Sequence, residues 1–155
     1  MTPSQRLAEL GLQLPEPPRP VGSYVPAVRT GRLVLVSGQI PLENGVVTTA
    51  GKVGGNVTLD DARAAARRCA LNGLAIAAHA AGGVDHIARV VRLGVFVNSA
   101  PGFTDQPKVA NGASDLMVEI FGEAGRHARA AVGANELPLN AAVEVEMMVE
   151  LREDA

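Results

Sequence analysis

One arginine in this 155-residue chain has neighbours that suit it to bind a small carboxylate. Arg129 stands in the run Ala128-Arg129-Ala130-Ala131-Val132, at the start of a predicted strand. Small flanking side chains leave the planar guanidinium free to meet a carboxylate through two parallel hydrogen bonds. Taken alone, Arg129 is equally compatible with a solvated charge at a strand end or with a salt bridge between subunits.

A second segment, Ser37-Gly38-Gln39-Ile40-Pro41, ends another predicted strand. A Ser-Gly pair lets another group approach the backbone closely and leaves amide groups accessible to a ligand. The alternative is a simple turn at the end of the strand. Both interpretations remain open on these residues alone.

The last predicted strand carries acids on one face. Val143 and Val145 alternate with Glu144 and Glu146, which is the period of a strand with one buried face. Acids on the polar face of a strand are most often solvated charges. By themselves they do not indicate a function.

Other kinds of catalytic site find little support in the sequence. His79, His86 and His127 are scattered and Cys69 stands alone, so there is no metal-ligand spacing. A Ser-His-Asp triad has no nucleophile-elbow motif behind it, and no Walker or dinucleotide fingerprint occurs. We therefore expect neither a metal nor a cofactor, with Cys69 in the core and the histidines at the surface or capping helices.

The composition is that of a folded domain. Hydrophobic residues make up 47% and charged residues 19%, while aromatic residues are only 3% and tryptophan is missing. A core of Val, Leu, Ile and Ala fills space with small side chains, so we expect subunit association to complete it.

Charge and cysteine content indicate where the protein acts. A net charge of -2 provides no basic face for nucleic acid. The single cysteine excludes an intrachain disulfide and fits a reducing compartment. With no signal-peptide pattern and no apolar run of about 20 residues, a cytoplasmic protein that binds no membrane is predicted.

Hydrophobic periodicity and turn residues predict one α+β domain. A proline-rich run follows the first helix, residues 29–32 form a turn and residues 41–57 form a loop. Thr58 caps the second helix. The core-facing residues of the last helix are Leu116, Met117, Ile120 and Phe121. The predicted helices span residues 1–14, 58–80 and 109–121, and the predicted strands span residues 24–28, 33–36, 88–97, 130–134 and 142–151. The order ββ–α–β–α–ββ predicts one mixed sheet with two helices on one face.

Several motifs together carry a family resemblance. They are Gly22-Ser23-Tyr24, Val36-Ser37-Gly38-Gln39-Ile40-Pro41, Ala128-Arg129-Ala130-Ala131-Val132, Leu137-Pro138 and Val143-Glu144-Val145-Glu146. In this order they resemble the RidA/YjgF family, the reactive intermediate deaminases, over roughly residues 21–151. The resemblance implies a chorismate-mutase-like fold and a homotrimer with three sites in the clefts between subunits. It divides the chain into an N-terminal arm, residues 1–20, and a family domain, residues 21–155.

The resemblance also implies roles for individual residues. Arg129 corresponds to the carboxylate-binding arginine, and Glu144 to the acid that holds or activates water. The other implied site residues bind the substrate: Tyr24, Ser37, Gly38, Ala131 and Asn111. The chain departs from compact members in its arm and in a longer region over residues 98–115, and His127 replaces a proline that often precedes the Ala-Arg pair.

The implied activity is cofactor-independent hydrolytic deamination of small enamine and imine intermediates of amino acids, giving 2-oxo acids and ammonia. The alternative is a non-catalytic trimer that binds small carboxylates as a regulatory protein. Ribonuclease activity, a name attached to the family, fits poorly. This acidic chain with few aromatic residues has no stripe of basic and aromatic side chains to bind a nucleic-acid strand. The expected partners are a small carboxylated metabolite and other copies of this chain.

Overall fold

A computed structural model describes residues 1–18 and 22–155. Five strands form one mixed sheet in the order β1-β2-β7-β5-β6, in which only the β5–β6 pair is parallel. The strands are β1 (Ala27–Thr30), β2 (Leu33–Gln39), β5 (Ile87–Asn98), β6 (Ala128–Ala134) and β7 (Val143–Leu151). The predicted α+β class and mixed sheet are confirmed.

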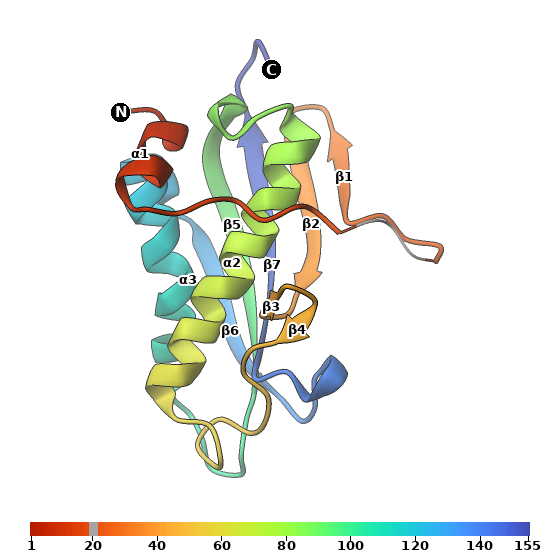
Figure 1. Cartoon of the computed structure of the whole chain (residues 1–155), viewed down its shortest axis with the longest axis vertical. Coiled ribbons are helices and arrows are strands. Elements are labelled where there is room, and N and C mark those ends of the chain that lie inside the picture. The colour runs from red at the N-terminus through yellow and green to blue at the C-terminus, as the bar shows by residue number, and fades with distance from the viewer. Residues whose placement is uncertain (19–21) are drawn as a thin grey trace.

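Two long helices cover one face of this sheet, α2 (Leu59–Ala81) and α3 (Gln106–Phe121), as Figure 1 shows. The Thr58 hydroxyl accepts a hydrogen bond from the Asp61 amide, so it caps α2 as predicted. Gly82 ends the helix in the left-handed conformation, with φ 79°. Among the described residues, no helix lies on the other face of the sheet, which is called the open face below.

The alternation in β7 decides which side chains reach the core. Val143, Val145 and the following odd-numbered residues are buried, whereas Glu144, Glu146 and the following even-numbered residues are half-buried on the open face. Burial in β7 therefore follows the predicted period of two.

Several predicted element boundaries were wrong. The first helix, α1 (Pro3–Glu9), is shorter than predicted, β1 begins at Ala27 rather than residue 24, and α3 begins at Gln106 with Pro107 in its first turn. Phe121 is half-buried and packs against the core, so it points inward as predicted.

The predicted loop over residues 41–57 contains a hairpin of two short strands, β3 (Leu42–Glu43) and β4 (Val46–Val47). Asn44 and Gly45 turn it with φ 53° and 78°, the positive values that an Asn-Gly turn supplies. Three short 3₁₀ segments complete the structure: Val84–His86, Gly122–Gly125 and Pro138–Asn140.

The N-terminal arm packs on the helical layer. Leu7 of α1 is buried, and the Ser4 amide and hydroxyl both donate to the Asp85 carboxylate, at 2.8 and 2.5 Å. Beyond α1 the arm crosses over α2 towards β1 (Figure 1). The predicted boundary between residues 20 and 21 lies outside the described residues. Across the described chain, every helix is too short or too polar to span a bilayer.

Candidate functional site

Arg129 lies on β6, at the parallel edge of the sheet, beside α3. Its Nη1 donates to Asn111 Oδ1 at 2.8 Å and to Ser114 Oγ at 3.1 Å, and both acceptors belong to α3. The arginine is exposed and lines a cavity of about 260 Å³. The structure thus brings together two of the predicted site residues, Arg129 and Asn111.

Ser114 also contacts His127, the residue that precedes β6. Ser114 Oγ lies 2.9 Å from His127 Nε2, and His127 Nδ1 lies 2.6 Å from the Gly125 carbonyl oxygen. The sequence predicts His127 at the surface or in a helix cap, and Ser114 is not among the predicted site residues. No sequence motif links Ser114 with His127, because their contact depends on the path of the chain from the end of α3 to the start of β6.

Glu144 lies on β7, on the open face, with its carboxylate above Gly38 of β2. A Cβ on Gly38 would lie 2.8 Å from Glu144 Cδ, so the glycine leaves the space that the carboxylate occupies. Gly38, Glu144 and the exposed Tyr24 line one cavity of about 290 Å³. Three more predicted site residues therefore lie together.

Burial raises the pKa of the Glu144 carboxyl above its ordinary value, and the negative charge of Glu146 raises it further. Glu146 lies 3.7 Å from Arg92 in an ion pair on the same face. Burial likewise raises the pKa of Cys69 well above the ordinary thiol value, with the Glu144 charge adding to the effect. Cys69 lies in the core, as predicted, and its thiol lies 3.5 Å from the Val143 carbonyl oxygen.

Ser37 and Ala131 lie at the margins of these two groups. The Ser37 hydroxyl donates to the Val25 carbonyl at 3.2 Å and so holds the segment that leads from Tyr24 into β1. Ala131 stands opposite Val95 on the helix-facing side of the sheet, the side on which Arg129 also lies. The Ala131 side chain is partly buried against the hydrophobic core.

The arginine and the glutamate lie on opposite faces of the sheet. Arg129 stands opposite Leu93, whose side chain is buried under the helices, whereas Glu144 stands opposite Phe96 on the open face. Along the strands they are three residues apart, which is about 10 Å, and across the sheet they are two strands apart, which is about 10 Å in total. One chain therefore holds two separate groups of residues, named below the Arg129 half-site (Arg129, Asn111, Ser114 and His127) and the Glu144 half-site (Glu144, Gly38 and Tyr24).

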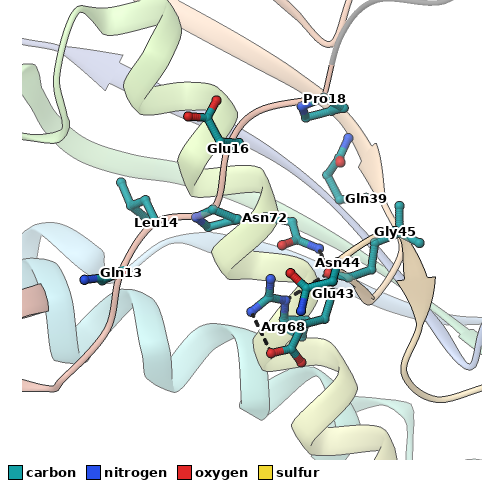
Figure 2. Close-up of a pocket in the computed structure, with 12 residues that line it drawn as sticks. Gln13, Leu14, Glu16, Pro18, Gln39, Glu43, Asn44, Gly45, Arg68 and Asn72 are labelled. Atoms are coloured by element: carbon teal, nitrogen blue, oxygen red, sulfur yellow. Dashed lines mark hydrogen bonds and ion pairs between the residues drawn. The ribbon is translucent and has the colours of Figure 1, made fainter.

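A third cavity of about 540 Å³ lies between the arm, α2 and the β3–β4 hairpin, and Figure 2 shows its lining. Arg68 Nε donates to the Leu42 carbonyl at 2.9 Å, and Asn72 Nδ2 donates to the Leu42 and Ile40 carbonyls at 3.0 and 3.2 Å. These bonds hold the start of the hairpin against α2. None of the predicted site residues lines this cavity.

Residues 1–18 and 22–155 contain no group of three or more His, Cys, Asp or Glu side chains arranged to hold a metal ion. The chemistry available at the two half-sites is that of a guanidinium, a serine–imidazole pair and a half-buried carboxylate. Together with the sheet topology, they define a small α+β protein with an exposed arginine, held by α3, at one edge of the sheet.

Comparison with known proteins gives the family. A family model described as "YjgF/chorismate mutase-like, putative endoribonuclease" matches residues 4–151. Protein TCP17 of Trypanosoma cruzi is 48% identical over 146 residues, which cover 94% of this chain and 91% of that protein. This chain belongs to the YjgF/chorismate mutase-like family, to which RidA proteins also belong.

Two further relatives extend the comparison. A 2-iminobutanoate/2-iminopropanoate deaminase of Dermatophagoides farinae is 33% identical over 138 residues, covering 89% of this chain and 93% of that protein. The crystal structure of an Agrobacterium tumefaciens protein with unknown function is 45% identical, with a TM-score of 0.90, and covers 97% of this chain and 92% of that one.

Proposed function

We propose that this protein is a homotrimeric enzyme that hydrolyses 2-imino acids, in sites that each combine the Arg129 half-site of one copy with the Glu144 half-site of the next. The observation that carries the proposal is the placement of Arg129 and Glu144 on opposite faces of one sheet. A heterologous contact, repeated around a ring, brings the helical edge of one copy to the open face of its neighbour. That face carries exposed apolar side chains suited to such burial, among them Leu35 and Val132.

The chemistry follows from the two half-sites. The Arg129 guanidinium binds the substrate carboxylate through two hydrogen bonds and so sets the position of the neighbouring imine carbon. Glu144 accepts a proton from a water molecule as the water oxygen bonds to that carbon. The nitrogen then receives that proton from the Glu144 carboxyl group and a second proton from the newly formed hydroxyl group. As the C–N bond breaks, ammonia leaves and the hydroxyl oxygen becomes the carbonyl of a 2-oxo acid. The relative named 2-iminobutanoate/2-iminopropanoate deaminase supports this reaction class.

The remaining site residues support the same geometry. Asn111 accepts from Arg129 and orients its guanidinium, and Gly38 leaves room for the Glu144 carboxylate. Tyr24 lines the same cavity as Glu144 and Gly38. We place this activity in the cytoplasm, in keeping with the single buried thiol of Cys69.

Complementation between two inactive variants tests the composite site. Arg129→Ala and Glu144→Gln should each abolish release of ammonia from 2-iminopropanoate generated by an amino-acid oxidase. Co-expressed in equal amounts, they should recover about one quarter of the wild-type activity, because each half-site comes from a different, randomly chosen copy.

The outcomes separate the possibilities. Mixed oligomers with no more activity than the parents would show that the site is not shared between copies. Wild-type protein that binds 2-oxobutanoate but releases no ammonia would overturn catalysis and favour a non-catalytic carboxylate-binding trimer. An Arg129→Ala variant with unchanged turnover would overturn the role of this arginine.

A further inference from the structure

We propose that His127 and Ser114 are positioning residues, which orient the Arg129 guanidinium for the substrate carboxylate through a directed chain of hydrogen bonds. This inference rests on the carboxylate-binding role proposed above for Arg129. Its basis is the geometry of four groups in sequence: the Gly125 carbonyl, the His127 imidazole, the Ser114 hydroxyl and the guanidinium.

The partners determine where each hydrogen lies. The Gly125 carbonyl oxygen can only accept, so His127 Nδ1, 2.6 Å away, carries a hydrogen and donates it. In the neutral imidazole, Nε2 is then an acceptor. The Ser114 hydroxyl, 2.9 Å from Nε2, therefore donates to His127.

This direction frees the Ser114 lone pairs for the arginine. Arg129 Nη1 lies 3.1 Å from Ser114 Oγ and donates to it, while a second hydrogen of Nη1 reaches Asn111 Oδ1 at 2.8 Å. Without His127, the hydroxyl could turn its hydrogen elsewhere and its lone pairs away from the guanidinium. His127 thus acts on Arg129 only through Ser114.

Both hydrogens of Nη1 are engaged, and this fixes the plane of the guanidinium. The Nη2 and Nε edge is then the edge that a carboxylate can meet with two parallel bonds. Arginine has a long, flexible side chain, and ordering it on binding opposes affinity. An exposed Arg129 already held in its binding orientation avoids part of that loss.

Substitution of His127 by glutamine or by asparagine tests the two ring nitrogens separately. A glutamine at position 127 can place its amide oxygen near the site of Nε2 and accept from Ser114. An asparagine at the same position reaches only the site of Nδ1, so it can donate to Gly125 but leaves Ser114 without its acceptor. His127→Gln and His127→Asn therefore form a matched pair that separates the proposed role from a merely structural one.

The test measures kcat and KM for 2-iminopropanoate and the Kd for 2-oxobutanoate by calorimetry. His127→Asn and Ser114→Ala should each raise KM and Kd by about three- to tenfold, the effect of losing one hydrogen bond, with kcat changed less than about twofold. His127→Gln should stay within about twofold of wild type. Adding His127→Asn to Ser114→Ala should cause no further loss, because both act in one chain. His79→Gln, on the exposed side of α2, is the control and should change neither constant.

Each result is decisive. Equal KM and Kd values for the Asn and Gln variants, or additive losses in the double variant, would overturn the positioning role while leaving Arg129 in its own role. Wild-type protein that binds 2-oxobutanoate without turnover, with the same dependence on residue 127, would overturn deamination but support this inference. Wild-type protein that neither turns over the imine nor binds the 2-oxo acid would overturn both.

Discussion

The Glu144 carboxyl group combines partial burial with a negative neighbour on its own strand. Burial raises its pKa most, and Glu146 adds to the rise. A carboxyl group must be ionised to accept a proton from water, so a raised pKa moves the loss of activity upward in pH. The proposed base therefore stops working at a less acidic pH than an ordinary glutamate would.

Removing the neighbouring charge should reverse part of this effect. Glu146→Gln lowers the pKa of Glu144 towards its ordinary value, so the acidic limb of kcat/KM against pH should move to lower pH. Burial remains, and the limb should stay above the ordinary glutamate range. Glu150→Gln, on the same face but further along β7, is the control and should leave the limb in place. A limb that did not move in Glu146→Gln would exclude Glu144 as the titrating group.

The Arg129 half-site depends on how closely α3 lies against α2. Gly112 of α3 faces the backbone of α2, and a Cβ there would overlap the Arg63 carbonyl oxygen. The obstacle is backbone, which cannot rotate away as a side chain can. Because α3 carries Asn111 and Ser114 next to Gly112, the helix contact also sets the position of the groups that hold Arg129.

Gly112→Ala should therefore weaken the whole domain as well as the site. Forcing the helices apart should lower the free energy of unfolding by about 1–3 kcal/mol, measured by urea denaturation. Gly55→Ala is a suitable control, since a Cβ there comes no closer than 3.3 Å to its neighbours. An unchanged unfolding midpoint for Gly112→Ala would mean that the two helices separate at little cost.

The molecule as a whole has one helix-covered face and one open face. Leu35, Val28 and Val132 lie exposed on the open face, and the half-buried acids of β7 run between them. An apolar surface of this kind indicates association. Subunit contact over this face would bury Glu144 further and bring it to a neighbouring Arg129.

A charge on this face should therefore prevent assembly without unfolding the chain. Leu35 is 40% exposed in the single chain, so Leu35→Asp is tolerated there, but burial of an unpaired aspartate in an interface is unfavourable. Light scattering should show monomers with a native circular dichroism spectrum and no deaminase activity. Leu10→Asp offers a control of matched exposure, 39%, on the helical side, and should remain assembled. A Leu35→Asp protein of unchanged mass would place the interface elsewhere.

Local patterns account for most of what could be predicted. The alternation in β7, the cap at Thr58 and the left-handed Gly82 act within a few residues, so the sequence determines them directly. Asn44-Gly45 is an equally local signal for a hairpin turn. The prediction of a loop over residues 41–57 was wrong there, because it did not use this signal. The motif order supplied the family and the identity of Arg129 and Glu144 as candidates.

What the sequence by itself determined was thus the set of elements and the residues worth considering for chemistry. Only the tertiary structure decided which of those residues meet. Arg129 reaches Asn111 across 18 residues and Ser114 across 15, and both contacts require the return from α3 into a parallel edge strand. No local sequence pattern predicts the path from α3 to β6. None predicts that Arg129 and Glu144 lie on opposite faces of the sheet. Strand register sets the face of each side chain, and packing of α3 on α2 sets the distances.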